Sequence, residues 1–277
     1  MMDMVDVYKR NHVNVSGHGE RPIIFAPGFG CNQNMWRLIA PAFEDQYKVV
    51  LFDYVGTGLS DHQAYDPIRY GDLLGYAEDL LQICEAIDAR DAILVGHSVG
   101  ATIAMLAANR DPQRFAHLIM IGPSPCYVND PPDYYGGFTK EDLEGLIELL
   151  DKNFAGWANY LSGAVMQNPD RPSLSRELEE SFCSIDPEIA RRFAVATFFA
   201  DTRQELQKVR VPALIMQCQG DIIAPVEVGE YVHDQLPGSI YQLMQATGHC
   251  PHLSHPEETI SIIQSYLDSI PTIDSTE

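Results

Sequence analysis

The sequence contains a serine, an acid and a histidine in an order and setting that suit nucleophilic catalysis. Ser98 stands at the centre of Gly96-His97-Ser98-Val99-Gly100, a G-x-S-x-G pattern. A short apolar run at 92–95 leads into it and an alanine-rich run at 101–108 leads out. This context predicts a sharp strand-to-helix turn that presents the hydroxyl. A serine hydroxyl is a weak nucleophile, so the chemistry also needs a base and an acid that orients the base.

Both partners follow later apolar runs, as the chain order serine, acid, histidine requires. Asp221 comes directly after the run at 213–218. His249 follows the run at 240–244 and is preceded by Gly248. The sequence therefore predicts Ser98 as nucleophile, His249 as general base and Asp221 as the acid that orients the imidazole.

Acyl transfer also needs N–H donors for the oxyanion of the tetrahedral intermediate. The backbone N–H of Val99, next to the nucleophile, is expected to be one donor. The other is expected from the loop Pro27-Gly28-Phe29-Gly30, where the N–H of Phe29 is flanked by glycines. The sequence thus predicts an oxyanion hole formed by Phe29 and Val99.

The histidines of the same region also allow a metal-site interpretation. His249, His252 and His255 are spaced H-x-x-H-x-x-H. Pro251 and Pro256 prevent one helix from presenting all three on one face, and no paired carboxylates accompany them. We therefore expect neither a metal nor any other cofactor.

The glycine-rich loop has a second interpretation as a dinucleotide-binding fingerprint. Gly28-x-Gly30-x-x-Gln33 is followed by Asp53 after the next apolar run. The third position of that fingerprint is normally Gly or Ala, and here it is Gln. A nucleotide-binding function is therefore disfavoured.

The surrounding elements alternate between strand and helix. Buried strands are predicted at 23–26, 49–52, 92–95, 118–121, 213–216 and 240–244. Helices are predicted at 76–87, 102–109, 226–235 and 257–267, the last with Ser254 and Glu257 as a capping box. This alternation predicts an α/β fold with a mostly parallel sheet flanked by helices.

One interval, 122–211, contains no predicted strand. Helical patterns lie at 140–152, 154–167, 175–182 and 187–200. A helical cap over the carboxyl edge of the sheet, where open α/β sheets bind ligands, explains the excess length. We expect a core of 1–122 and 209–277 and a cap of 123–208. Aromatic residues of this interval are candidates for a substrate pocket: Phe138, Phe154, Trp157, Phe198 and Phe199.

Composition limits the partners. The 277 residues are 45% hydrophobic and carry 18 Lys plus Arg against 39 Asp plus Glu, a formal net charge of -21. Such a chain repels phosphate backbones and anionic membrane surfaces, so neither nucleic acid nor a membrane is an expected partner. The start of the sequence has no signal-peptide pattern, and the six cysteines show no CxxC spacing. A cytoplasmic location is expected.

Beyond the triad, several segments resemble the α/β-hydrolase fold in general and the RsbQ-like stress-response regulators in particular. Karrikin and strigolactone receptor hydrolases are similar in outline but usually carry His-Gly where this chain has Pro27-Gly28. The segments that carry the resemblance are Phe25-Ala-Pro-Gly-Phe-Gly-Cys31, Leu51-Phe-Asp-Tyr-Val-Gly56, Gly96-His-Ser-Val-Gly100, Gly122-Pro-Ser-Pro-Cys-Tyr127, Asn129-Asp-Pro-Pro132, Tyr134-Tyr-Gly-Gly-Phe138 and Gly248-His-Cys-Pro-His252.

The resemblance implies a serine hydrolase with a four-helix cap inserted after the sixth strand, over an apolar cavity. It implies action on a small hydrophobic ester or acyl compound. It also implies a signalling role together with a PAS-domain phosphatase in the stress response. A general carboxylesterase and a non-catalytic ligand-binding module of a signalling pathway remain alternatives.

Overall fold

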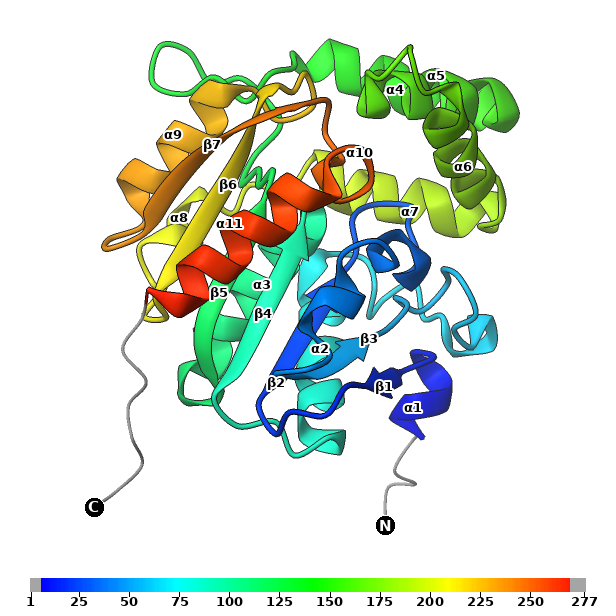
Figure 1. Ribbon diagram of the computed structural model, residues 1–277. Helices are drawn as coiled ribbons and strands as arrows, with labels where there is room; N and C mark the ends of the chain where they lie inside the picture. The colour runs from blue at the N-terminus through cyan, green and yellow to red at the C-terminus, as the bar shows by residue number, and fades with distance from the viewer. Residues whose placement is uncertain (1–5, 270–277) are drawn as a thin grey trace, which may run out of the picture.

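Each of the six predicted apolar runs forms a strand of one seven-stranded sheet in the computed structural model, which describes residues 6–269 (Figure 1). The sheet order is β1-β3-β2-β4-β5-β6-β7, and β1 is antiparallel to β3 while the other neighbouring strands pair in parallel. The strands are β1 (Asn14–Ser16), β2 (Pro22–Ala26), β3 (Lys48–Leu51), β4 (Ala92–His97), β5 (Phe115–Ile121), β6 (Ala213–Gly220) and β7 (Ile240–Thr247). The sequence missed β1 because its three residues are all exposed and give no apolar signal.

Both faces of the sheet are covered, because successive side chains of a strand point to opposite sides. In β2, Ile24 and Ala26 belong to one apolar cluster, whereas Ile23 and Phe25 belong to another. Helices α2 (Leu73–Ala86), α3 (Val99–Arg110) and α9 (Val226–Gln235) contribute to the first cluster, and α11 (Pro256–Asp268) contributes to the second. Figure 1 shows α11 crossing one face of the sheet, with α3 on the other. The parallel, doubly covered sheet predicted from the sequence is confirmed.

The remaining short helices are α1 (Val7–Arg10), α8 (Arg203–Leu206) and α10 (Pro251–Ser254). Within residues 6–269, no helix has the length and apolar character needed to cross a bilayer.

The predicted capping box of the last helix is wrong. The helix α11 begins at Pro256 with His255 at the N-cap, and no side chain caps it. Ser254 instead ends α10, and its hydroxyl donates to the carbonyl of Cys250. Ser254 therefore belongs to the short helix α10 and cannot serve as the N-cap of α11, which the sequence pattern predicted.

The long interval without strands forms four helices between β5 and β6: α4 (Lys140–Lys152), α5 (Phe154–Met166), α6 (Pro172–Cys183) and α7 (Pro187–Phe198). They follow the fifth described strand and not a sixth, because only five segments before them pair into the sheet. Figure 1 shows them as a group at one end of the strands, beside the end of β7 from which the chain continues into α10. Their buried side chains join the same apolar cluster as α2 and α3. The four helices therefore pack directly on the region that holds the predicted triad.

Candidate active site

Ser98 occupies the turn between β4 and α3, as the G-x-S-x-G pattern predicts. Its backbone has φ 54° and ψ −126°, a conformation that residues other than glycine rarely adopt. The N–H of Ser98 donates to the carbonyl of Ile121 at 2.9 Å, which ties the turn to β5. A strained serine held by the surrounding structure is typical of a functional turn.

The glycines on either side of Ser98 serve close packing. Neither Gly96 nor Gly100 is among the residues with a positive φ. A Cβ on Gly100 would lie 2.4 Å from the carbonyl oxygens of both Ala26 and Pro27. One on Gly96 would lie 2.5 Å from the Cα of Ala101. The turn is sharp because the serine itself takes the unusual conformation, and the glycines let α3 approach β2.

His249 and Asp221, the residues predicted as base and orienting acid, are hydrogen-bonded to each other. The Nδ1 of His249 lies 2.6 Å from the Oδ2 of Asp221, and both side chains are buried. The other carboxylate oxygen, Oδ1, accepts the N–H groups of Ile223 and Ala224 at 2.8 and 3.1 Å. An ionised carboxylate can only accept, so Nδ1 carries the proton and Nε2 keeps its lone pair. Among the described residues Nε2 has no hydrogen-bond partner.

Ser98 and His249 line the same small cavity, which has a free volume of about 30 Å³. The polar partner recorded for the Oγ of Ser98 is the hydroxyl of Tyr127 at 3.4 Å. Burial raises the pKa of Tyr127 to about 12, so this hydroxyl stays neutral. The sequence did not single out Tyr127, although it ends the segment Gly122–Tyr127 that carries part of the family resemblance.

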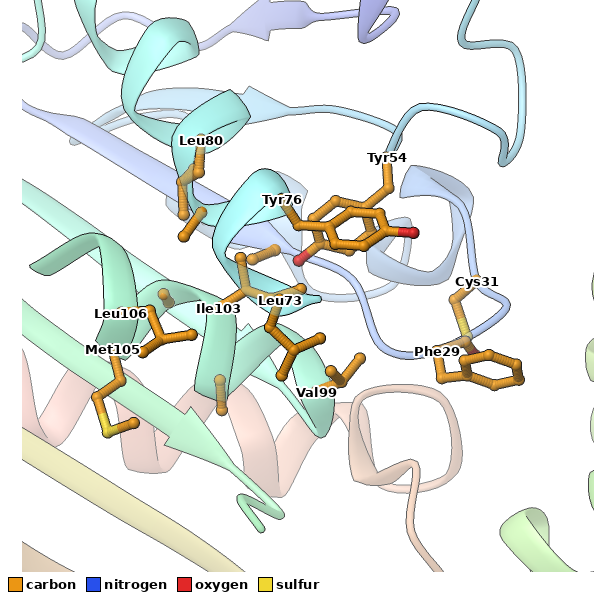
Figure 2. Packing of buried hydrophobic residues seen from close by; sticks show 14 of the residues in the cluster. Phe29, Cys31, Tyr54, Leu73, Tyr76, Leu80, Val99, Ile103, Met105 and Leu106 are labelled. Atoms are coloured by element: carbon orange, nitrogen blue, oxygen red, sulfur yellow. The ribbon is translucent and has the colours of Figure 1, made fainter. Parts of the chain in front are cut away.

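The two N–H groups predicted for the oxyanion hole are both free to donate. Val99 is the first residue of α3, where a helix leaves its N–H groups without internal partners. Within the described part of the chain, neither its N–H nor that of Phe29 has an acceptor. Figure 2 shows Phe29 on the loop that follows β2 and Val99 at the start of α3. Unpaired amides beside a nucleophile are the donors that a tetrahedral intermediate requires.

The structure separates the predicted pocket aromatics into two groups. Phe198 lines the cavity at Ser98, and Phe138 lines a second cavity next to it. Phe154, Trp157 and Phe199 are not among the residues that line these two cavities, and their assignment to a substrate pocket stays a prediction. Trp157 is 1% exposed and stacks on Phe154 with ring centroids 5.5 Å apart. Trp157 also contacts the rings of Phe182 in α6 and Phe29 after β2, so it packs between the cap helices and the core.

The other side chains that line the cavity at Ser98 were not predicted. Most are apolar residues of the cap and of the loops at the carboxyl edge: Cys31, Leu161, Val165, Leu178, Phe182, Thr197 and Ile223. They come from α5, α6, α7 and two loops: Leu161 and Val165 lie one turn apart in α5, as do Leu178 and Phe182 in α6, but no sequence motif joins these segments.

The histidines near the site do not form the H-x-x-H-x-x-H metal set. His255 contacts the hydroxyl of Ser254, and His249 is bound to Asp221. His252 instead lies with His97 and Cys250, whose ligand atoms are all within 4.8 Å of one another. This buried cluster is where these residues could hold a metal.

Burial keeps the groups of that cluster neutral. It lowers the pKa of His252 to about 3 and that of His97 well below its ordinary value, and it raises the pKa of the Cys250 thiol. His97 contributes to the site in another way, because its Nε2 lies 2.7 Å from the carbonyl oxygen of His249. A carbonyl only accepts, so His97 donates this bond and ties the base to the serine turn.

Asp53, the acid of the dinucleotide interpretation, has a structural use. It is 1% exposed, and its carboxylate accepts the N–H groups of Gln33 and Leu59 at 2.8 and 2.9 Å. These bonds join two loops at the carboxyl edge of β2 and β3. Both carboxylate oxygens already have backbone partners, which argues against contact with a ribose.

Comparison with known proteins assigns this chain to a family. Residues 21–256 match the family described as the alpha/beta hydrolase fold. The chain belongs to this family. It is therefore a hydrolase, with the seven-stranded, mostly parallel sheet of the fold.

Several α/β-hydrolases are similar over nearly the whole chain. Karrikin insensitive 2 receptor CA from Petunia hybrida is 36% identical over 94% of this chain and 97% of its own length. A strigolactone esterase from Arabidopsis thaliana is 33% identical over 96% and 99%. The crystal structure of a hydrolase from Oleispira antarctica superposes with a TM-score of 0.93, at 44% identity over 96% and 97%.

Proposed function

We propose that this α/β-hydrolase cleaves small hydrophobic carboxylic esters with Ser98 as nucleophile. The bond of 2.6 Å between His249 and Asp221 carries the proposal, since it leaves Nε2 as a free base in the cavity of Ser98. Nε2 takes the hydroxyl proton while Oγ attacks the carbonyl carbon of the ester. The carbonyl oxygen becomes an oxyanion that accepts the N–H groups of Phe29 and Val99.

The intermediate then collapses into products in two stages. The imidazolium of His249 gives its proton to the departing alkoxide, which leaves as the alcohol, and the acyl group stays on Ser98. Water, deprotonated by the same Nε2, attacks the acyl carbon. The bond between this carbon and Oγ then breaks, Oγ takes the proton from His249 to restore the serine hydroxyl, and the carboxylic acid leaves. Asp221 holds the ring in the required tautomer throughout and accepts no proton itself. No cofactor is needed for these steps.

Relatives named as esterases support this activity. They include the strigolactone esterase from Arabidopsis thaliana and a probable esterase from Oryza sativa that is 36% identical over 94% of this chain. Within the proposed enzyme, residues 123–208 act as the cap and residues 1–122 and 209–277 as the core. The cap helices supply most of the apolar lining opposite Ser98.

Replacing the nucleophile tests the activity directly. Ser98→Ala should lower the kcat for a short-chain p-nitrophenyl ester by about 10⁴-fold or more, because triad members act as a unit. The matched control is Ser162→Ala, a buried serine of α5 that does not line the cavity. Hydrolysis near the wild-type rate by folded Ser98→Ala would refute the assignment.

A signalling role is the finer part of the proposal. The sequence segments shared with RsbQ-like regulators, together with the receptor relatives, favour an enzyme whose product or ligand reaches a PAS-domain phosphatase. The test combines a pull-down of that phosphatase with a stress-reporter assay in a Ser98→Ala strain. Binding without reporter output is expected if hydrolysis makes the signal. Full output would favour a ligand-binding module, and absence of binding would favour a general carboxylesterase.

A further inference from the structure

Two cavities of very different size meet at one wall: an inner one at Ser98 and an outer one that is partly open to solvent, since Tyr160 and Ile222 of its lining are exposed. The inner cavity, at Ser98, has a free volume of about 30 Å³, and the outer one has about 500 Å³. Leu161, Phe198 and Ile223 line both. About 10–15 Å³ of such volume holds one water molecule. The inner cavity therefore accepts a group of only a few atoms, whereas the outer one has room for a long chain.

The outer cavity is apolar over most of its lining. It lies between α4, α5 and the segments around 137–138 and 222–223, and its lining includes Phe138, Leu143, Leu146, Leu149, Ala164 and Ile222. Asp142 also lines it, but its carboxylate accepts the hydroxyl and the N–H of Thr139 in the capping box of α4. The surface offered to a ligand is thus a hydrocarbon-binding one.

The outer cavity lies on the same side of Ser98 as the base. The N–H of His249 donates to the carbonyl of Val165 in α5 at 2.8 Å, so α5 packs directly against the base. Ile223, in the shared wall, donates its N–H to Asp221. His249 must protonate the leaving alcohol, so the alcohol half of a bound ester faces α5 and Ile223.

Other parts of the inner cavity offer less to an apolar chain. Phe182 lines it, and its ring lies 5.9 Å from that of Phe29. A Cβ on Gly30 would come within 2.3 Å of the Phe182 ring, so these groups are closely packed. A pocket of about 250 Å³ shares Leu178 with the inner cavity, but its lining includes the polar side chains of Asn32, Asn34, Glu177 and Glu180. An acyl chain that extended there would meet polar groups, whereas the outer cavity offers mostly apolar ones.

We propose that this hydrolase is selective for esters of a short acyl group and a long apolar alcohol. The acyl group occupies the inner cavity, and the alcohol passes the wall of Leu161, Phe198 and Ile223 into the outer cavity. The proposal rests on the esterase activity proposed above and names its substrate class.

Two isomeric esters of similar intrinsic reactivity provide the test, and their rates of alkaline hydrolysis without enzyme correct for the remaining difference. Hexyl acetate carries its long chain on the alcohol, and ethyl hexanoate carries it on the acyl group. We expect kcat/KM for hexyl acetate to exceed that for ethyl hexanoate by about tenfold or more. A hydrophobic pocket discriminates by about this factor or more when a substrate places its methylene groups outside the pocket. Equal values, or the reverse order, would overturn the proposal.

Substitution of two glycines in the cap helices tests whether the outer cavity binds the long alcohol. Gly145 in α4 lines it, Gly163 in α5 does not, and an added Cβ at either position meets nothing within 4 Å. Gly145→Trp should raise KM for hexyl acetate about tenfold and leave ethyl acetate unchanged. Gly163→Trp should change neither.

The outcomes separate the substrate class from the activity itself. Equal loss on both acetates in folded Gly145→Trp, or no loss on either, would overturn the role of the outer cavity. Failure of the wild-type enzyme to cleave ethyl acetate, hexyl acetate and ethyl hexanoate alike would instead overturn the esterase activity on which the proposal rests. Circular dichroism of both variants establishes that they are folded.

Discussion

The hydrogen-bonding limits of three groups near Ser98 determine how the site is arranged. Asp221 can only accept, so it fixes the tautomer of His249. The carbonyl of His249 can only accept, so it fixes the donor nitrogen of His97. Tyr127 stays protonated because burial raises its pKa. Within the described residues 6–269, the Nε2 of His249 stays unpaired in the cavity of Ser98, as does the buried Nδ1 of His97.

Asp221→Asn should lower kcat by about 10⁴-fold while leaving the fold intact. The amide oxygen can still accept from the N–H groups of Ile223 and Ala224, whereas the amide nitrogen would face Nδ1. His249 then carries its proton on Nε2 and cannot act as base. Ester hydrolysis measures the loss, with Asp53→Asn, another buried loop aspartate, as the control. Asp221→Asn with more than a tenth of wild-type kcat would contradict the orienting role.

At the scale of elements, the contact between the serine turn and β2 decides the geometry. The first turn of α3 lies so close to the end of β2 that only glycine fits at position 100. Position 100 thus holds the start of α3, where Val99 lies, against the loop after β2 that carries Phe29. The packing of α3 and the oxyanion hole proposed above therefore depend on the same small residue.

Gly100→Ala should lower the free energy of unfolding by about 2 kcal/mol or more, since its methyl group would meet two backbone oxygens that cannot move. The matched change Gly145→Ala adds a methyl group in open space and should be neutral or stabilise α4 by about 0.5 kcal/mol. Urea unfolding measures both. Similar stability for the two variants would show that α3 can shift away from β2.

At the scale of the whole molecule, tertiary packing buries the two neighbouring histidines His97 and His252. His252 lies between the rings of Trp36 and His97, with centroids 4.7 and 4.4 Å away. Burial lowers the pKa of both histidines, and Arg37 and His249 add to the effect on His252. The folded protein therefore excludes protons that the unfolded chain binds below about pH 6.5.

Stability should consequently fall as the pH is lowered from 7 to 5. The unfolded state binds more protons in this range, so His252, whose pKa is about 3 in the folded protein, costs about 2 kcal/mol of unfolding free energy at pH 5, and His97 acts in the same direction. His252→Leu removes one of these contributions and leaves every carboxylate in place. Urea unfolding at the two pH values should show a pH dependence about 2 kcal/mol smaller for the variant. An unchanged difference would mean that His252 is protonated in the folded state.

The sequence alone predicted six of the seven strands, the four helices between β5 and β6, and the candidate residues of the triad and oxyanion hole. Each of these depends on local signals: apolar runs bounded by turn residues, helical periodicity, and the motif around Ser98. It did not determine β1, whose residues are exposed, or the start of α11, where a short helix takes up the expected cap.

Only the tertiary structure decided which aromatic rings line a cavity. Phe198 and Trp157 are both buried residues of cap helices, yet one faces Ser98 and the other packs within the cap. The placement of Tyr127 beside Ser98, and of His252 beside His97, was likewise decided there. The physical reason is that packing between segments far apart in the chain sets these contacts, and no local pattern of residues records it.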